Sequence, residues 1–202
     1  MSEAQGFLDS IQCFDLWLFK ADGLLTAALE LTKSSNALRQ ELSSVADTHK
    51  GHEERWQNSL HLNGSASLLY GYALETLFKG ILLKHKPESI ELEMTMNGSG
   101  EIGSAKINKL GVQMNKGHDL VVLANEIGLF KLIENPKQAK KTLNYLSECV
   151  KWRSRYPAPQ ESKKNRRLTG EEATDFMVNS IFIHFDPIYL KSLEIAENGI
   201  PE

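Results

Sequence analysis

The chain has 202 residues, of which 41% are apolar and 24% are charged, and this composition excludes a disordered or fibrous protein and predicts one globular domain, residues 1–202. The N-terminus, Met1–Gln5, carries an acid where a secretory signal carries lysine or arginine, and no apolar run reaches the roughly 20 residues of a membrane span. We therefore expect a cytoplasmic protein with no membrane partner. Cys13 and Cys149 are too few for a disulfide scaffold and have the wrong spacing for a zinc knuckle, so both are expected to be reduced. No metal and no cofactor is expected.

The net charge of −3 hides an uneven distribution along the chain. Between Lys131 and Leu168, eleven basic residues stand against three acids, a local charge of +8, whereas the rest of the chain carries −11. Lysine and arginine concentrated on one part of a surface raise the local potential and attract phosphates. This segment predicts an anionic partner, although a solvated helix face followed by a basic loop accounts for the same charges.

The first predicted helix runs from Phe14 to about Val45, because apolar residues recur along it every three or four positions. Gly23 and the pair Ser34-Ser35 are points at which this helix could bend or split. The polar stretch from Asp47 to Asn63 has little periodicity and is predicted to be a connection.

The second helix, Ser67 to His85, is the most apolar of the chain and ends before Pro87. A helix that is apolar in nearly every direction lies in the middle of a bundle. From Ser89 to Gly117 the pattern changes, because apolar and polar residues alternate and Asn97–Gly100 supplies the residues of a tight turn. We expect a small β-hairpin or loop insertion near residues 89–110.

Short signals place the ends of the later helices. Asp119 can cap a helix that continues to Ile127 and that Gly128 terminates, and Asn135-Pro136 can begin the next one. In that next helix the apolar residues form an inward stripe and the lysines point outward. Pro157 and Pro159 stop it.

The last part of the chain predicts one or two further helices. Thr169–Glu172 is a capping box ahead of the apolar run Phe176, Met177, Ile181 and Phe182, and Asp186-Pro187 then restarts or kinks the helix. The whole pattern predicts an all-α fold, an antiparallel up-and-down helical bundle with the small insertion near residues 89–110.

Two positions in this bundle are candidates for a functional site. Glu75 and Lys79 are one turn apart in the most apolar helix and can form an ion pair, which is more often structural than catalytic. His118 precedes the Asp119 cap, so we expect it at a helix N-terminus facing the same region as the hairpin, as a mostly neutral imidazole that can donate or accept a hydrogen bond.

Two other motifs are not expected to be functional. Gly98–Gly103 satisfies G-x-G-x-x-G, but no buried strand precedes it and no apolar helix follows at once, so a dinucleotide site is not predicted. His49, His52 and His61, with Glu53 and Glu54, lack the helical or loop framework that fixes the geometry of metal ligands.

Three segments resemble the HEPN superfamily of small helical domains: Tyr72–Leu83 with its A-x-E-x-x-x-K element, Gly117–Leu120, and Trp152–Pro157. The resemblance covers roughly Ser67 to Pro157. It implies an up-and-down bundle that tends to form homodimers. Members of this superfamily include RNA-cleaving toxins, partners of nucleotidyltransferases and RNA-binding accessory modules.

The ribonuclease members carry an arginine, four to six intervening residues and a histidine. Arg155 is followed by Tyr-Pro-Ala-Pro-Gln, and no histidine occurs after it until His184. Arg55 and His61 have the right spacing but precede the A-x-E helix. The pair that would supply acid–base chemistry and stabilise a phosphate is therefore incomplete, which favours a protein that is not an enzyme, and no catalytic residue is assigned.

The favoured hypothesis is a non-catalytic, HEPN-like homodimer that binds RNA, a nucleotide or another phosphate-bearing ligand at a basic edge. The predicted ligand-binding residues are Arg153, Arg155, Tyr156, His118, Glu75 and Lys79, with Trp152 beside them. Arg153 continues the inward stripe of its helix and could instead be a partner of Glu75 in the core.

Two alternatives stay open. One is a metal-independent, toxin-like ribonuclease that uses His118 or His61 with Arg153 or Arg155. The other is a protein-binding module that engages an antitoxin or a nucleotidyltransferase.

Overall fold

The computed structural model describes residues 3–43, 51–113, 116–156 and 180–202, with the side chains of the last helix from residue 184 onward. The described elements are α1 (Glu3–Gln12), α2 (Phe14–Ser43), α3 (His52–His85), η1 (Pro87–Ser89), β1 (Ile90–Met96), β2 (Ile102–Leu110), α4 (Leu120–Glu126), α5 (Leu129–Leu132), α6 (Pro136–Glu148), η3 (Cys149–Arg153) and α8 (Ser180–Asn198). They confirm the predicted all-α bundle with a small hairpin. None of the described helices is long and apolar enough to cross a membrane.

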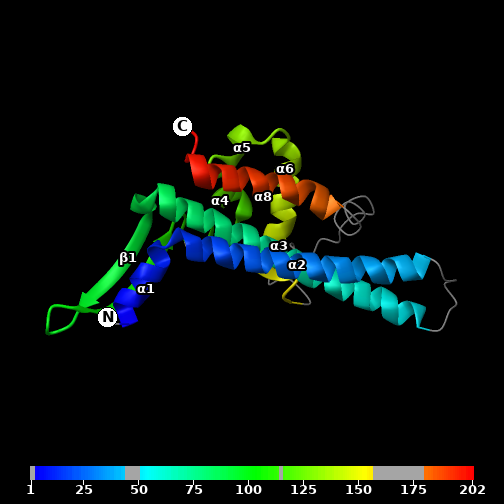
Figure 1. Ribbon diagram of the computed structural model, residues 1–202, viewed down its shortest axis with the longest axis horizontal. Coiled ribbons are helices and arrows are strands. Elements are labelled where there is room, and N and C mark those ends of the chain that lie inside the picture. The colour runs from blue at the N-terminus through cyan, green and yellow to red at the C-terminus, as the bar shows by residue number, and fades with distance from the viewer. Residues whose placement is uncertain (1–2, 44–50, 114–115, 157–179) are drawn as a thin grey trace.

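The two longest helices, α2 and α3, lie side by side along the long axis of the molecule (Figure 1). The shorter helices α4, α6 and α8 pack against one half of α3, and α5 packs on these three. That half of α3 forms the centre of the core, where Tyr70, Leu74, Phe78 and Ile81 are at most 1% exposed. Burial of each such side chain contributes roughly 1.5–3 kcal/mol. The predicted central helix is thus confirmed from Ser67 onward.

The predicted connection between residues 47 and 63 is wrong from His52 onward, because α3 begins there and continues to His85. Its first half packs on α2 through polar side chains: Ser59 Oγ lies 3.0 Å from Ser35 Oγ and accepts a hydrogen bond of 3.0 Å from Arg39 Nε. Such contacts leave no apolar periodicity in the sequence. Ser35 is buried in this seam, and α2 is continuous through Ser34-Ser35 and Gly23.

Helix α1 was not predicted, and it supports the base of the hairpin. Its Ile11 packs with Leu83 of α3 and Leu110 of β2 in a small apolar cluster separate from the main core. Strands β1 and β2 pair antiparallel from Ile90 opposite Leu110 to Met96 opposite Ile102, which confirms the predicted hairpin.

The predicted caps are confirmed. Asp119 accepts a hydrogen bond from the Val122 N–H at the start of α4, and Asn135 accepts one from the Gln138 N–H at the start of α6. Gly128 follows α4 with a φ of +71°. Of the two alternatives predicted for Asp186-Pro187, a restart or a kink, the restart is wrong, because α8 runs through these residues as one helix.

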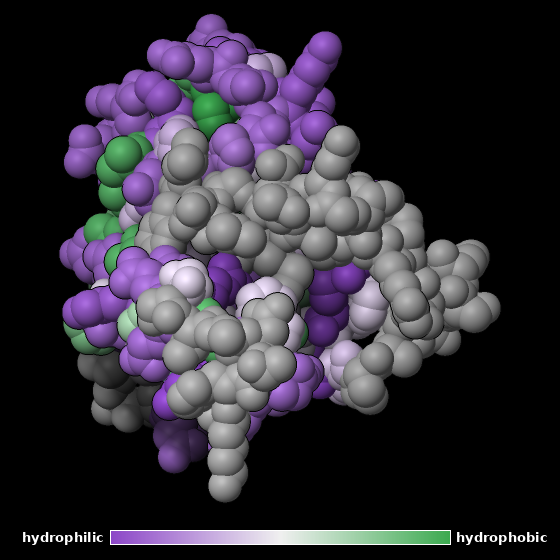
Figure 2. All heavy atoms as spheres, turned by 90° about the vertical axis from the view of Figure 1, so that its right-hand side faces the viewer, coloured by the Kyte–Doolittle hydropathy of each residue, from purple (hydrophilic) through white to green (hydrophobic). Residues whose placement is uncertain are grey.

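Some predicted features lie outside the described residues. They are Pro157, Pro159, the capping box Thr169–Glu172, the side chains of the apolar run that follows it, and His49. Seen from the end of the α2–α3 pair, the described surface is mostly hydrophilic, with apolar residues in small patches (Figure 2).

Candidate functional site

Glu75 is the centre of a polar cluster on α3. Its side chain is buried, yet both carboxylate oxygens have partners: Oε1 lies 2.6 Å from Lys79 Nζ and Oε2 lies 2.9 Å from His118 Nδ1. The predicted pairing of Glu75 with Lys79 is confirmed. The structure adds His118, which lies 43 residues further along the chain, to the same carboxylate.

The two partners of Glu75 differ in their access to solvent. The Lys79 side chain is 16% exposed, whereas the His118 side chain is 49% exposed. An ionised carboxylate can only accept hydrogen bonds, so Nδ1 of His118 carries the ring hydrogen and donates a hydrogen bond to Glu75. Nε2 is then the ring nitrogen left for a ligand, and no described residue bonds to it.

Asp119, the neighbour of His118 in the chain, contacts the basic residue Lys151 of η3. Its Oδ1 caps α4 through the Val122 N–H, and its Oδ2 lies 3.0 Å from Lys151 Nζ. Burial acts to raise the pKa of Asp119, but the hydrogen bond and charge of Lys151 and the backbone N–H bonds outweigh it and hold the pKa below its usual value. The sequence identified Asp119 only as a cap and missed the contact with Lys151.

A close helix contact positions these groups. Gly71 of α3 lies against Val150 and Leu146, where an added Cβ would lie 2.5 Å from Val150 Cγ2. The Leu120 N–H donates to Ser147 Oγ over 2.9 Å and thereby ties the start of α4 to α6. The absence of a side chain at Gly71 lets α3 approach the end of α6 and the following turn, which carries Lys151.

Arg153 does not take the place beside Glu75 that the sequence allowed for it. Its Nη2 and Nε lie 2.7 and 3.2 Å from Glu148 Oε2, and its guanidinium lies 4.8 Å from the centre of the Trp152 ring. Glu148 and Arg153 are five residues apart in the sequence. They can pair because η3, which follows Glu148, is a π-helix, in which residues five apart lie on the same side.

Arg155 and Tyr156 follow η3 and are exposed. The Arg155 guanidinium lies 5.2 Å from the centre of the Tyr156 ring, and its Nη2 donates to the Tyr156 hydroxyl over 3.3 Å. Within α6 itself, Ala139, Leu143 and Leu146 are buried, whereas its three lysines are exposed, which confirms the predicted inward stripe. Those lysines are Lys137, Lys140 and Lys141.

Several residues considered from the sequence lie elsewhere. Arg55 and His61 are in the first half of α3, and His61 precedes Glu75 by fourteen residues, a rise of about 21 Å along the helix. Gly98–Gly103 forms the hairpin turn and the start of β2. The basic residues between 157 and 168 lie outside the described part of the chain. Among the described residues, no group of three or more histidines, cysteines or acids is placed to hold a metal ion.

No protein-family model, curated protein or solved structure matches this chain. The resemblance to the HEPN superfamily therefore stays a prediction that rests on the three segments that carry it.

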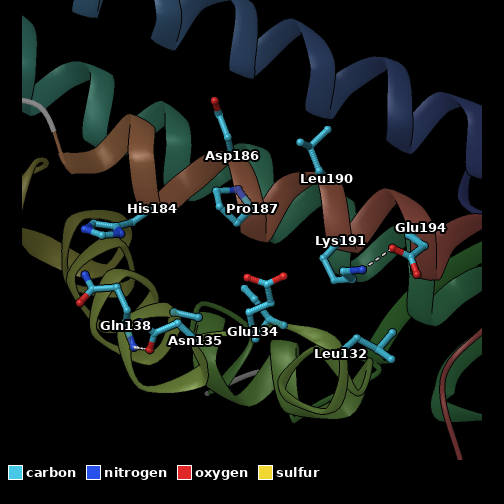
Figure 3. A pocket seen from close by; sticks show the side chains of 12 residues that line it. Leu132, Glu134, Asn135, Gln138, His184, Asp186, Pro187, Leu190, Lys191 and Glu194 are labelled. Carbon is cyan, nitrogen blue, oxygen red and sulfur yellow. Dashed lines mark hydrogen bonds and ion pairs between the residues drawn. The ribbon is translucent and has the colours of Figure 1, made fainter.

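A cleft of about 550 Å³ lies apart from the Glu75 cluster, between α8 and the connection from α5 to α6 (Figure 3). Nothing in the sequence pattern indicated this cleft, because its residues come from two segments about 50 positions apart.

Proposed function

We propose that the protein binds a phosphate-bearing ligand, RNA in the first place, without cleaving it. The binding surface, called the basic edge below, consists of Lys79, His118, Lys151, Arg155 and Tyr156. The observation that carries this proposal is the close placement of two groups of ion pairs, Lys79 and His118 on Glu75 and Lys151 on Asp119, which the chain neighbours His118 and Asp119 hold next to each other.

The carboxylates in these ion pairs orient the cations. Lys79 and Lys151 each donate to one carboxylate, and an ammonium group has three N–H donors, so each lysine keeps donors for a phosphate oxygen. Ion pairing reduces the net charge of the surface but also lowers the side-chain entropy that a ligand must remove. Arg155 adds a guanidinium for which no carboxylate partner is found among the described residues.

Tyr156 supplies a feature that a purely electrostatic surface lacks. Its ring is 48% exposed next to the Arg155 guanidinium. Nucleic acid bases stack on exposed aromatic rings, with a contribution of about 1–3 kcal/mol per base. A single-stranded RNA fits this combination of cations and one ring better than a free phosphate ion does.

The test is RNA binding by an Arg155→Ala variant, measured by fluorescence anisotropy with a labelled single-stranded RNA over a range of salt concentrations. We expect weaker binding and a salt dependence flatter by about one unit of slope, because one phosphate contact is lost. Arg153→Ala should have a smaller effect, because Glu148 already pairs with Arg153. Lys20→Ala, an exposed lysine on α2, is the matched control and should bind like the parent.

The proposal is refuted if the parent protein shows no salt-dependent RNA binding, or if Arg155→Ala binds with the affinity and salt dependence of the parent. The homodimer implied by the family resemblance is part of the proposal. Sedimentation equilibrium of the full chain tests it.

A metal-independent ribonuclease is a second candidate, and the contact between Glu75 and His118 favours it. A buried carboxylate that holds one ring nitrogen of a histidine orients the other nitrogen for proton transfer. If His118 acts in this way, the parent cleaves RNA in the presence of EDTA and His118→Asn does not. Absence of cleavage by the parent under these conditions excludes this candidate and leaves the binding proposal untouched.

A further inference from the structure

The cleft between α8 and the α5–α6 connection is large enough for a small ligand. Its volume of about 550 Å³ lies within the range of about 300–1,000 Å³ that is common for ligand pockets. In Figure 3, Glu134 points from the α5–α6 connection toward α8, where Pro187 faces it and the ion pair of Lys191 and Glu194 lies to one side. Asp186 and Leu190 project from α8 at the rim.

The charges around the cleft are predominantly negative. Three carboxylates line it, and the single lysine, Lys191, lies 2.5 Å from Glu194 and offsets that carboxylate. Glu134 and Asp186 have no hydrogen bond or ion pair within the part of the chain that the structure describes. The cleft therefore holds about two negative charges that its own residues do not compensate.

The N-terminus of α6 also faces this cleft, and its partial positive charge opposes the negative charge of the carboxylates. A helix N-terminus is equivalent to about half a positive charge, and at α6 Asn135 already caps the Gln138 N–H. About two uncompensated carboxylate charges outweigh this half charge. The site therefore favours a cation over an anion.

Apolar side chains complete the lining. Leu132 is 38% exposed and Leu190 is 64% exposed, and Pro187 and Ala139 also line the cleft. Exposed leucines beside a concave surface gain free energy when a ligand covers them, about 25 cal/mol for each Å² removed from water. A ligand for this cleft thus carries an apolar body as well as a positive charge.

We propose that this cleft binds a small organic cation, a primary ammonium or guanidinium group on a short apolar body. The charged group lies against Glu134, with Asp186 as a second negative charge at the rim, and the apolar body covers Leu132, Pro187 and Leu190. The proposal is independent of the proposed RNA-binding function, because the two surfaces share no residue.

The experiment uses benzylammonium as the probe and the ¹⁵N-labelled full chain as the target. Shifts in the amide NMR spectrum are followed during a titration, with benzyl alcohol and benzoate as matched ligands that have the same ring and no positive charge. We expect saturable shifts with benzylammonium alone, confined to residues 132–139 and 184–194. In Glu134→Gln/Asp186→Asn, the Kd for benzylammonium should rise about three- to tenfold, because one exposed ionic contact and a second nearby negative charge are lost.

The control variant is Glu197→Gln, which removes an exposed acid from the same helix outside the cleft and should leave the Kd unchanged within twofold. All the substituted side chains are exposed, so the variants should fold, and the dispersion of the same spectra verifies this. Equal binding of benzyl alcohol, tighter binding of benzoate, or an unchanged Kd in the double variant each overturns the proposal.

Discussion

Glu75 accepts hydrogen bonds from Lys79 and His118 although only 7% of the residue is exposed. Replacement by alanine leaves the ammonium of Lys79, which is 16% exposed, without its counter-charge. We expect Glu75→Ala to lower the free energy of unfolding by about 3 kcal/mol in urea denaturation. His118→Ala should cost much less, because half of that side chain is in water. If Glu75→Ala unfolds like the parent but no longer binds RNA, the pair is functional rather than structural.

The two cysteines differ in burial and therefore in reactivity. Burial raises the pKa of the Cys149 thiol to about 11, whereas Cys13 is partly exposed between α1 and α2. Because the thiolate is the reactive form, we expect a disulfide reagent at pH 8 to modify one thiol of the native protein rapidly and the second only on unfolding. Cys13→Ser should abolish the rapid phase and Cys149→Ser should retain it. Rapid modification of Cys149 in the native protein would contradict the buried position of η3.

At the scale of elements, the glycines of α3 offer a comparison within one helix. An alanine at position 71 would place its Cβ 2.5 Å from Val150 Cγ2 and 3.1 Å from the Leu146 carbonyl, whereas nothing lies within 4 Å of the corresponding position at Gly64. Alanine is favoured over glycine in a helix by about 1 kcal/mol. We therefore expect Gly64→Ala to stabilise the protein by up to that amount.

Gly71→Ala gains the same helix propensity but pushes α6 away from α3. Overpacking of this kind costs about 1–3 kcal/mol, so we expect a net loss of stability in urea denaturation. The variant should also weaken RNA binding, because the displaced α6 continues directly into η3, which carries Lys151. A stability equal to that of Gly64→Ala would show that the two helices are not in close contact.

The elements that the sequence predicted correctly are those with local signals. Asp119, Gly128 and Asn135 act on backbone groups one to three residues away, so a short motif suffices. The first half of α3 lacked such a signal, because it packs on α2 through Ser59 and Arg39 rather than through an apolar stripe. The contact between Glu75 and His118 depends on the packing of α3 against the start of α4, and no local pattern reports it.

At the scale of the whole molecule, the hairpin stands outside the main core. Its outer part, Met94–Ala105, is largely exposed, and its base packs on α1. Replacing Met94–Ala105 by an Asn-Gly turn between the paired residues Glu93 and Lys106 should shift the Tm by less than about 3 °C, because little apolar surface is lost. A larger loss in thermal denaturation would show that the hairpin belongs to the cooperative unit.

The pH dependence of stability follows from three buried acids. Burial raises the pKa values of Cys149, Tyr145 and Tyr189, and the hydrogen bond to Asp22 raises that of Tyr189 further. A raised native pKa means that the unfolded chain loses its proton first, so the stabilisation is complete below the unfolded pKa and is lost as pH rises. Burial raises the pKa of Cys149 to about 11. We therefore expect the urea concentration at the midpoint of unfolding to fall as the pH rises from about 9 toward 11. An unchanged midpoint over this interval would contradict the burial of these groups.

Helices α2 and α3 extend beyond the short helices of the bundle, and over that length, within the part of the chain that the structure describes, they pack on each other (Figure 1). The two halves of α3 therefore differ in local stability. The amide of Ile81 is in the core and exchanges its hydrogen only when the whole protein unfolds, whereas the amides around Glu54 open by fraying of the two-helix end. Hydrogen exchange should thus slow steadily along α3 from His52 to Ile81. The far end of the pair can unwind and re-form while the basic edge and the acidic cleft keep their geometry.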